Sequence, residues 1–112
     1  DTGYVAGETH GLIAATADAN GYLSWNDAKG YCAIYFVIVG GNTYDDWFLP
    51  SKDELNQLYV NRAAIGGFTN NSYWSSTESD DGINAWIEEF PTGYQYTANK
   101  NSTGTVRAVR AF

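Results

Sequence analysis

The stretch from Tyr73 to Phe112 constrains the fold of this chain more than any other feature. Four short segments in it have the residue types of β-strands and are separated by turn residues: Tyr73–Thr77, Asn84–Phe90, Gly93–Lys100 and Thr105–Phe112. Because Pro91-Thr92-Gly93 is a turn sequence, the second and third segments are expected to pair as an antiparallel hairpin. The 12 Gly and only 2 Pro also favour short strands and frequent turns.

Two helices are predicted upstream of these strands. Ser24 is a candidate N-cap with Asp27 three residues later, and four residues at helical spacing then share a face: Trp25, Ala28, Cys32 and Tyr35. Ser51 and Glu54 form a Ser-x-x-Glu capping box, which is followed by an apolar stripe of Leu55, Leu58 and Tyr59. Gly66-Gly67 is expected to end this second helix.

Two further segments are apolar. Gly11–Thr16 indicates a short strand entering the core. Ala33–Val39 is a continuous apolar run that either extends the first helix or forms a strand, since periodicity does not separate the two.

Six aromatic residues are assigned to the core: Trp25, Trp47, Phe68, Trp74, Trp86 and Phe90. Arg107 and Arg110 are expected on opposite faces of the last strand, the inward one paired with an acid such as Glu54 or Glu78.

Length and charge limit the functions that remain. The 112 residues suffice for one core, so 1–112 is expected to be a single domain. Thirteen acidic against six basic residues give a net charge of −7, which would repel a nucleic acid or an anionic membrane surface. No apolar run reaches the length of a membrane span, so membrane insertion is not expected.

Few residues in the chain have the chemistry of catalysis or metal binding. Cys32 and His10 are the only Cys and His, so a zinc site is excluded by count. Cys32 is expected to be a small buried hydrophobe, with a Cys32–His10 pair as the weaker alternative. Asp45-Asp46 and Ser79–Gly82 offer oxygens for calcium but lack the ligand spacing of a calcium loop. We therefore expect no enzyme, no cofactor and no resident metal.

Several motifs together resemble a known family. They occur in this order: Asp46–Leu55 (DWFLPSKDEL), Ile65–Phe68 (IGGF), Tyr73–Glu78 (YWSSTE), Ala85-Trp86, Phe90, Gly93 and Val106–Phe112 (VRAVRAF). This series resembles the C-type-lectin-like domain of bacterial surface and phage proteins, of the Lcl C-terminal or major-paralogous type. The resemblance implies an α+β, C-type-lectin-like fold with two helices around a small, mainly antiparallel sheet, and a last strand that pairs beside the first.

The resemblance also sharpens the function expected of the tail. Some members are variable proteins of diversity-generating retroelements, in which Asn codons mutate to codons for Tyr, Ser, Thr, Ile, Ala, Gly and Pro. In 83–105 such residues lie between fixed ones such as Trp86, Phe90 and Gly93. The candidate ligand-binding residues are Ile87, Pro91, Thr92, Tyr94, Tyr96, Thr97, Ala98, Asn99, Asn101, Ser102 and Thr105. Gly104 is also a product of such codons, whereas Glu88 and Glu89 are not. Ordinary selection for polar loops would give the same composition.

These observations predict a non-catalytic binding domain of the receptor or adhesin type. Its partner would be a protein or a glycan, and its location a cell surface, the extracellular space or a virion. Tyr94 and Tyr96, two residues apart on a strand, should share a face and anchor the ligand, with Thr97, Asn99 and Asn101 adding hydrogen bonds. The alternative is a structural module, for instance the trimerising tip of a surface or tail fibre, so a homo-oligomer stays open.

Overall fold

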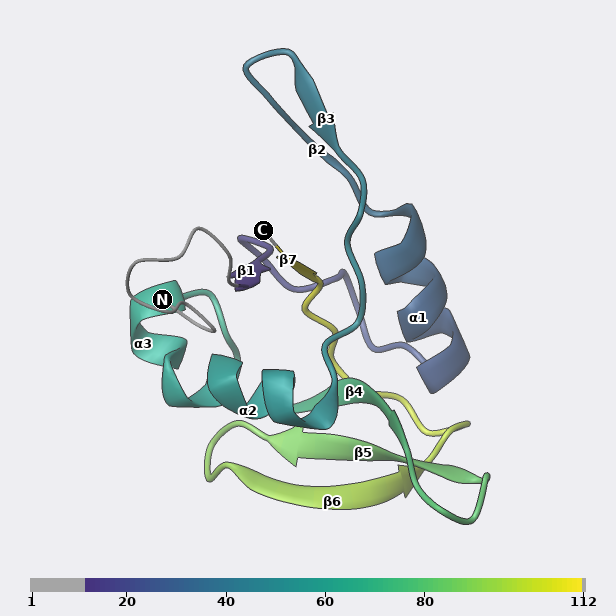
Figure 1. Cartoon of the computed structure of the whole chain (residues 1–112). Helices are drawn as coiled ribbons and strands as arrows, with labels where there is room; N and C mark the ends of the chain where they lie inside the picture. Colours follow the sequence, from purple (N-terminus) through teal and green to yellow (C-terminus); the bar gives the residue numbers. More distant parts are fainter. Residues whose placement is uncertain (1–11, 112) are drawn as a thin grey trace.

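The computed structural model describes residues 12–111 as an α+β arrangement (Figure 1). The elements in chain order are β1 (Leu12–Ala14), α1 (Trp25–Ile34), β2 (Val37–Val39), β3 (Asn42–Tyr44), α2 (Lys52–Val60), α3 (Arg62–Ile65), β4 (Ser72–Glu78), β5 (Asn84–Glu89), β6 (Tyr94–Asn99) and β7 (Val109–Ala111). The predicted fold class is confirmed, with a third, one-turn helix added in the described part.

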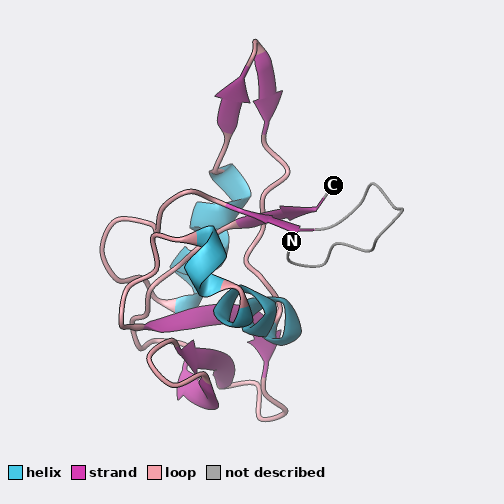
Figure 2. Cartoon of the chain, turned by 90° about the vertical axis from the view of Figure 1, so that its left-hand side faces the viewer, coloured by secondary structure: helices cyan, strands magenta, loops and turns pink. Residues whose placement is uncertain are grey.

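The first helix begins where the sequence predicts. The Ser24 side chain caps α1 by accepting a hydrogen bond from the Asp27 backbone N–H at 3.4 Å, and the helix buries Trp25, Ala28 and Cys32. The apolar run Ala33–Val39 is divided between a helix and a strand, because α1 ends at Ile34 and the backbone is extended at Tyr35. The last three residues of the run, Val37–Val39, form β2, which pairs with β3 as a hairpin that projects from the body (Figure 2).

The second helix has the predicted capping box. The Glu54 backbone N–H donates to the Ser51 hydroxyl at 3.2 Å, and the Ser51 backbone N–H donates to the Glu54 carboxylate at 2.8 Å. Leu55 and Leu58 are buried. The helix ends earlier than expected, at Val60, and α3 follows as a separate turn that stops at Gly66, whose φ of +78° suits glycine.

The largest sheet contains β4, β5 and β6 in antiparallel order. The predicted β5–β6 hairpin is confirmed, with Ile87 opposite Tyr96 and Glu89 opposite Tyr94. The segment around Thr105 extends the sheet on its other edge through a parallel bridge to Tyr73 in β4.

The two ends of the described chain lie side by side. β1 pairs with β7, which confirms the pairing that the family resemblance implies. The last strand is shorter than predicted, since only Val109–Ala111 is regular; the chain before it is extended and makes separate backbone hydrogen bonds to Ala15 and Ala19. The predicted first strand likewise shortens to Leu12–Ala14, and Gly11 lies outside the described residues.

The sheet separates two apolar clusters. Toward α1, Trp74, Ala85 and Ile87 pack with Trp25 and Cys32. Toward α2, Tyr73 and Phe90 pack with the helix residues Leu55 and Leu58. Of the predicted core aromatics, Trp25, Trp47, Trp74 and Phe90 are buried, whereas Phe68 and Trp86 are only half-buried. Trp86 is covered by the Lys52 ammonium, 3.7 Å from its ring centroid.

The arginine partners that we expected from the sequence are wrong. Arg107 is buried and its Nε donates to Asp18 at 2.9 Å, while Arg110 is partly exposed and pairs with Asp46. Neither Glu54 nor Glu78 takes part, because Glu54 caps α2 and Glu78 pairs with Lys100. The expected division into one inward and one outward arginine is confirmed.

The described helices are short. Among residues 12–111, none has the length and apolar character that crossing a membrane would require.

Candidate functional site

The β5–β6 hairpin is the rigid support of the candidate site. Its turn is closed by a hydrogen bond from the Gly93 backbone N–H to the Glu89 carbonyl at 2.6 Å. Gly93 has a φ of +77°, and a Cβ there would lie 2.5 Å from the Tyr59 ring. Both facts require glycine at this position, so the turn that carries the hairpin is fixed by packing against α2.

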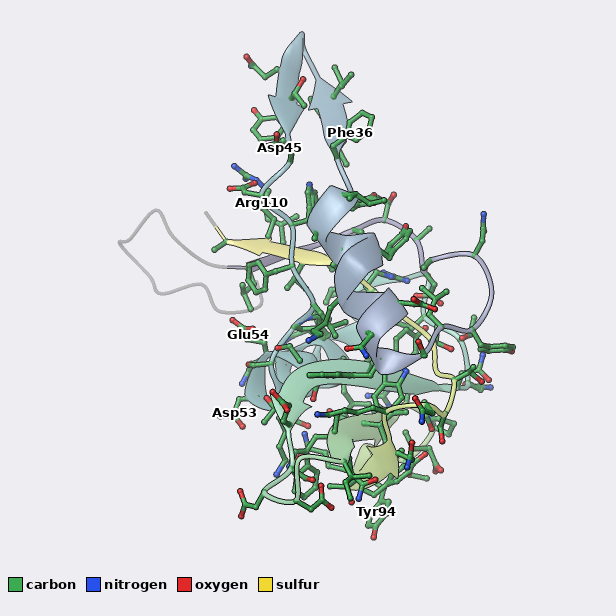
Figure 3. The ribbon with its side chains drawn as sticks, turned by 90° about the vertical axis from the view of Figure 1, so that its right-hand side faces the viewer. Phe36, Asp45, Asp53, Glu54, Tyr94 and Arg110 are labelled. Carbon is green, nitrogen blue, oxygen red and sulfur yellow. The ribbon has the colours of Figure 1, made fainter. Side chains whose placement is uncertain are left out.

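Two tyrosines form the most exposed aromatic surface of this hairpin. The rings of Tyr94 and Tyr96 are stacked, with centroids 5.7 Å apart and an interplanar angle of 19°. The Tyr94 side chain is 65% exposed and points away from the body at one end of the molecule (Figure 3). The prediction that both tyrosines share a face is therefore confirmed.

Tyr96 connects this pair to the start of β4. Its hydroxyl lies 3.0 Å from the Ser72 hydroxyl. The bond spans β5, and the opposing strand residue of Tyr96 is Ile87, which is buried. The tyrosine ring thus covers the apolar core while its hydroxyl stays in a polar contact, as is usual for tyrosines at binding surfaces.

A polar hollow lies beyond Ser72. It consists of two adjoining parts with volumes of about 270 Å³ and about 330 Å³. Both parts are lined by Tyr22, Asn71 and Thr105. The other lining residues are Asp18, Ala19, Asn20, Gly21, Thr69, Ser72, Thr103 and Gly104. The sequence predicted one of its lining residues, Thr105, as a ligand-binding residue but did not predict the hollow itself; a further signal was the aromatic Tyr22 directly after the turn at Asp18–Gly21.

A chain of hydrogen bonds fixes the polar groups around the hollow. The Tyr73 hydroxyl donates to Asp18 at 2.6 Å and accepts from the Thr69 backbone N–H at 2.9 Å, and the Asn71 amide donates to the Thr69 hydroxyl at 2.9 Å. Burial and the bond to Asp18 raise the pKa of Tyr73 to about 12, so its hydroxyl keeps its proton. Because Asp18 also pairs with Arg107, the network is anchored in the core.

Seven of the other predicted residues fall into four places. Ala98 lies on the tyrosine face and is half-buried. Thr97 and Asn99 alternate with it and therefore lie on the opposite face, together with Trp86. Pro91 and Thr92 form the hairpin turn, and Asn101 and Ser102 form an exposed turn after β6. The expected set is thus divided between two faces and two turns.

Three positions of the tail are held by packing. Ile87 and Thr105 are each only 4% exposed, and Thr105 Oγ1 has no hydrogen-bond partner among the described residues. A Cβ on Gly104 would lie 2.9 Å from Trp74 Nε1 and 3.2 Å from Ile87. Substitutions at these positions would disturb the core rather than only the surface.

The Cys32 thiol and the Asp81 carboxylate, two groups with catalytic or metal-binding potential, are held in environments that do not favour either role. Burial raises the pKa of the Cys32 thiol to about 12, which leaves almost no thiolate at neutral pH, and His10 lies outside the described residues. Asp81 accepts from the Ser79 hydroxyl and from the Ile83 and Asn84 backbone N–H groups, and these bonds hold its pKa well below its usual range. Residues 12–111 bring together no group of three His, Cys, Asp or Glu side chains suited to a metal ion.

Fold and surface together define a class of protein. Two capped helices around a small antiparallel sheet, with paired terminal strands, are the architecture of a C-type-lectin-like binding domain. The sequence matches the family model of the Lcl C-terminal domain over residues 3–110, and the chain belongs to this family of lectin-like binding domains. No curated protein matches the sequence.

Proposed function

We propose that this domain binds a protein or glycan ligand, without catalysis, through the Tyr94–Tyr96 face and the adjoining polar hollow. The observation that carries the proposal is the stacked tyrosine pair on a rigid hairpin, in which Tyr94 is exposed and half-buried Tyr96 is joined through Ser72 to the hollow. Rigid aromatic rings supply contact area at a low entropy cost, and the hydroxyl and amide groups around the hollow supply directional hydrogen bonds. We also propose that the domain is located in the extracellular space, on a cell surface or on a virion.

Charge favours a neutral or basic ligand group at this surface. The hollow has no Lys or Arg in its lining, and its one acid, Asp18, is paired with Arg107. The net charge of −7 disfavours a polyanionic ligand such as a nucleic acid.

The binding test compares two faces of the same strand. The chain is screened against an array of neutral and sulfated glycans and against a displayed protein library, and each binder is then measured with two double variants. Tyr94→Ala/Tyr96→Ala should weaken binding at least about tenfold, as expected for loss of aromatic anchors. The matched control, Thr97→Ala/Asn99→Ala, alters exposed residues of the opposite face and should change binding little. Binders that lose affinity only with the control pair would overturn the proposal.

We further propose that a retroelement diversifies the exposed part of this surface. Pro91, Thr92, Tyr94, Asn101 and Ser102 are exposed, so exchanging them leaves the core intact. Sequencing the codons for 73–112 across a population, with a search of the flanking DNA for a near-copy, tests the idea. Variation at adenines of the copy, concentrated at the exposed positions and sparse at Ile87, Gly104 and Thr105, is expected. A uniform tail without a nearby copy would contradict it.

A further inference from the structure

The first strand of the β2–β3 hairpin has the sequence of a buried element but a largely exposed position. Ala33–Val39 is apolar throughout, a pattern typical of strands buried on both faces. In the structure Phe36, Ile38 and Val39 are 58%, 61% and 59% exposed. We propose that this hairpin is the interface through which two copies of the chain associate.

Both faces of β2 are apolar, whereas β3 places Thr43 opposite Ile38 and Asn42 opposite Val39. Val37 and Val39 lie on one face with Tyr44, the strand partner of Val37, and this face lines an apolar groove of about 420 Å³. Ile13 and Trp47 line the same groove from the body. Phe36 and Ile38 alternate with these residues and lie on the other face. A hairpin with water on one side would carry polar residues there, so neither face of β2 has the composition of a solvated surface.

The hairpin edges are open to strand addition. β2 and β3 form a two-stranded sheet by themselves in the described part of the chain, and such a pair is marginally stable in water. The residues from Ala33 to Tyr44 include no Pro and no charged side chain, which are the usual protections of an exposed edge. Pairing two β2 edges about a twofold axis would give a four-stranded sheet in which the Ile38 side chains of the two copies lie side by side on one face and pack against each other.

Charge and composition favour a second copy as the occupant. The hairpin is neutral within a chain of net charge −7, so two hairpins meet without the repulsion that other parts of the surface would impose. Arg110 lines the groove, but its charge is balanced by Asp46. Residues 1–11 contain only three apolar residues besides glycine, Tyr4, Val5 and Ala6, whereas all seven residues of Ala33–Val39 are apolar.

Association at this hairpin would leave the proposed ligand surface free. Phe36 and Tyr94 lie at opposite ends of the molecule, whose longest extent is 40 Å (Figures 1 and 3). A dimer would therefore present two tyrosine faces pointing outward. Two linked faces bind a repetitive surface more tightly than either face alone, through the raised effective concentration of the second contact.

The test is the solution mass of the full chain by analytical ultracentrifugation over a concentration series. The wild type should reach the mass of two chains. Ile38→Asp places two like charges near the twofold axis and should return the mass to one chain. The matched control is Ile83→Asp, because Ile83 has the same exposure, 60%, but lies in the loop before β5. This variant should remain dimeric.

A distance measurement keeps the test independent of how Ile38→Asp folds. Cysteines are introduced at exposed Thr43 or Ser102 and spin-labelled, while buried Cys32, whose thiol keeps its proton, stays unlabelled. Labels at Thr43 should lie within roughly 20 Å of each other, as neighbouring strands are about 5 Å apart. Labels at Ser102 should be much farther apart.

Three results would overturn the proposal: a wild type that stays monomeric, an Ile83→Asp variant that dissociates as Ile38→Asp does, or a dimer with distant Thr43 labels. A monomer would also leave residues 1–11 or an unrelated apolar partner as the cover of the hairpin. None of these measurements requires a ligand, so they are independent of the proposed function.

Discussion

The buried arginine is the residue whose removal should cost the fold most. Arg107 Nε donates to Asp18, and Arg107 Nη1 donates to the carbonyls of Ala15 and Gly66 at 2.9 and 3.2 Å. Arg107→Met leaves a largely buried carboxylate and two carbonyls without this donor, and we expect it to lower the free energy of unfolding by about 3–5 kcal/mol. Urea denaturation measures the loss.

The control is the other arginine of the same segment. Arg110 pairs with Asp46, whose side chain is 61% exposed. Exposed ion pairs contribute little, so Arg110→Met should cost less than about 1 kcal/mol. Equal losses for the two variants would show that the Arg107–Asp18 pair does not anchor the network below the hollow.

The buried Glu88 makes the stability of the fold depend on pH. Glu88 is fully buried, and burial raises its pKa from 4.5 to about 7, although a hydrogen bond from Gln95 acts in the opposite direction. Between these two values the folded chain keeps a proton that the unfolded chain has lost. Stability from this group is therefore present below about pH 4.5 and is lost as the pH rises to about 7.

Glu88→Gln removes this titration. The variant should gain stability relative to the wild type as the pH rises from 4.5 to 8, by up to roughly 3 kcal/mol, since one pKa unit corresponds to about 1.4 kcal/mol. Urea denaturation at pH 4.5, 6 and 8 gives the difference at each pH. A difference that stays constant over this range would contradict the raised pKa.

Charged residues such as these were the least predictable from the sequence. Arg107 and Asp18 are 89 positions apart, and Arg110 and Asp46 are 64 apart, so no local pattern pairs them. We could expect one inward arginine from strand alternation alone. The identity of its partner depends on how the first turn packs under β4, which only the three-dimensional structure gives.

At the scale of elements, the two helix caps offer a graded comparison. Ser51 takes part in a reciprocal capping box, whereas the hydroxyl of Ser24 accepts a single, longer bond. Ser51→Ala should therefore cost about 1 kcal/mol, and Ser24→Ala distinctly less. Thermal or urea denaturation of both variants checks the order; a larger loss at Ser24 would contradict it.

Elements with a local signal were predictable, and those without one were not. The capping box specified where α2 begins, and Pro91–Gly93 specified the β5–β6 turn. The end of α2 was misplaced because Gly66 stops α3, one turn farther on. The run Ala33–Val39 stayed ambiguous because its pattern fits a buried helix or a buried strand equally well.

At the scale of the whole molecule, the tail combines a support and a surface. The sequence allowed us to predict the paired tyrosines, since positions i and i+2 of a strand share a face. We did not predict from the sequence that Thr97 and Asn99 lie on the opposite face of β6 from the tyrosines, although the alternation of side chains along a strand requires this. The hollow could not be predicted, because Tyr22, Asn71 and Thr103 come from three separate loops.

The division of the tail into exposed and buried positions predicts which substitutions the folded chain tolerates. Exposed Thr92, Asn101 and Ser102 have no role in the two apolar clusters, so replacing each by Tyr or Asp should change the free energy of unfolding by no more than about 0.5 kcal/mol. Ile87→Ala should cost about 2–5 kcal/mol, since Ile87 is buried against Trp74 and Ala85. Gly104→Ala should also destabilise, because its Cβ would meet the Trp74 ring. Denaturation of these variants side by side provides the measurement. If the exposed and buried positions cost the same, the tail is a single packed unit, and a surface diversified independently of the core is excluded.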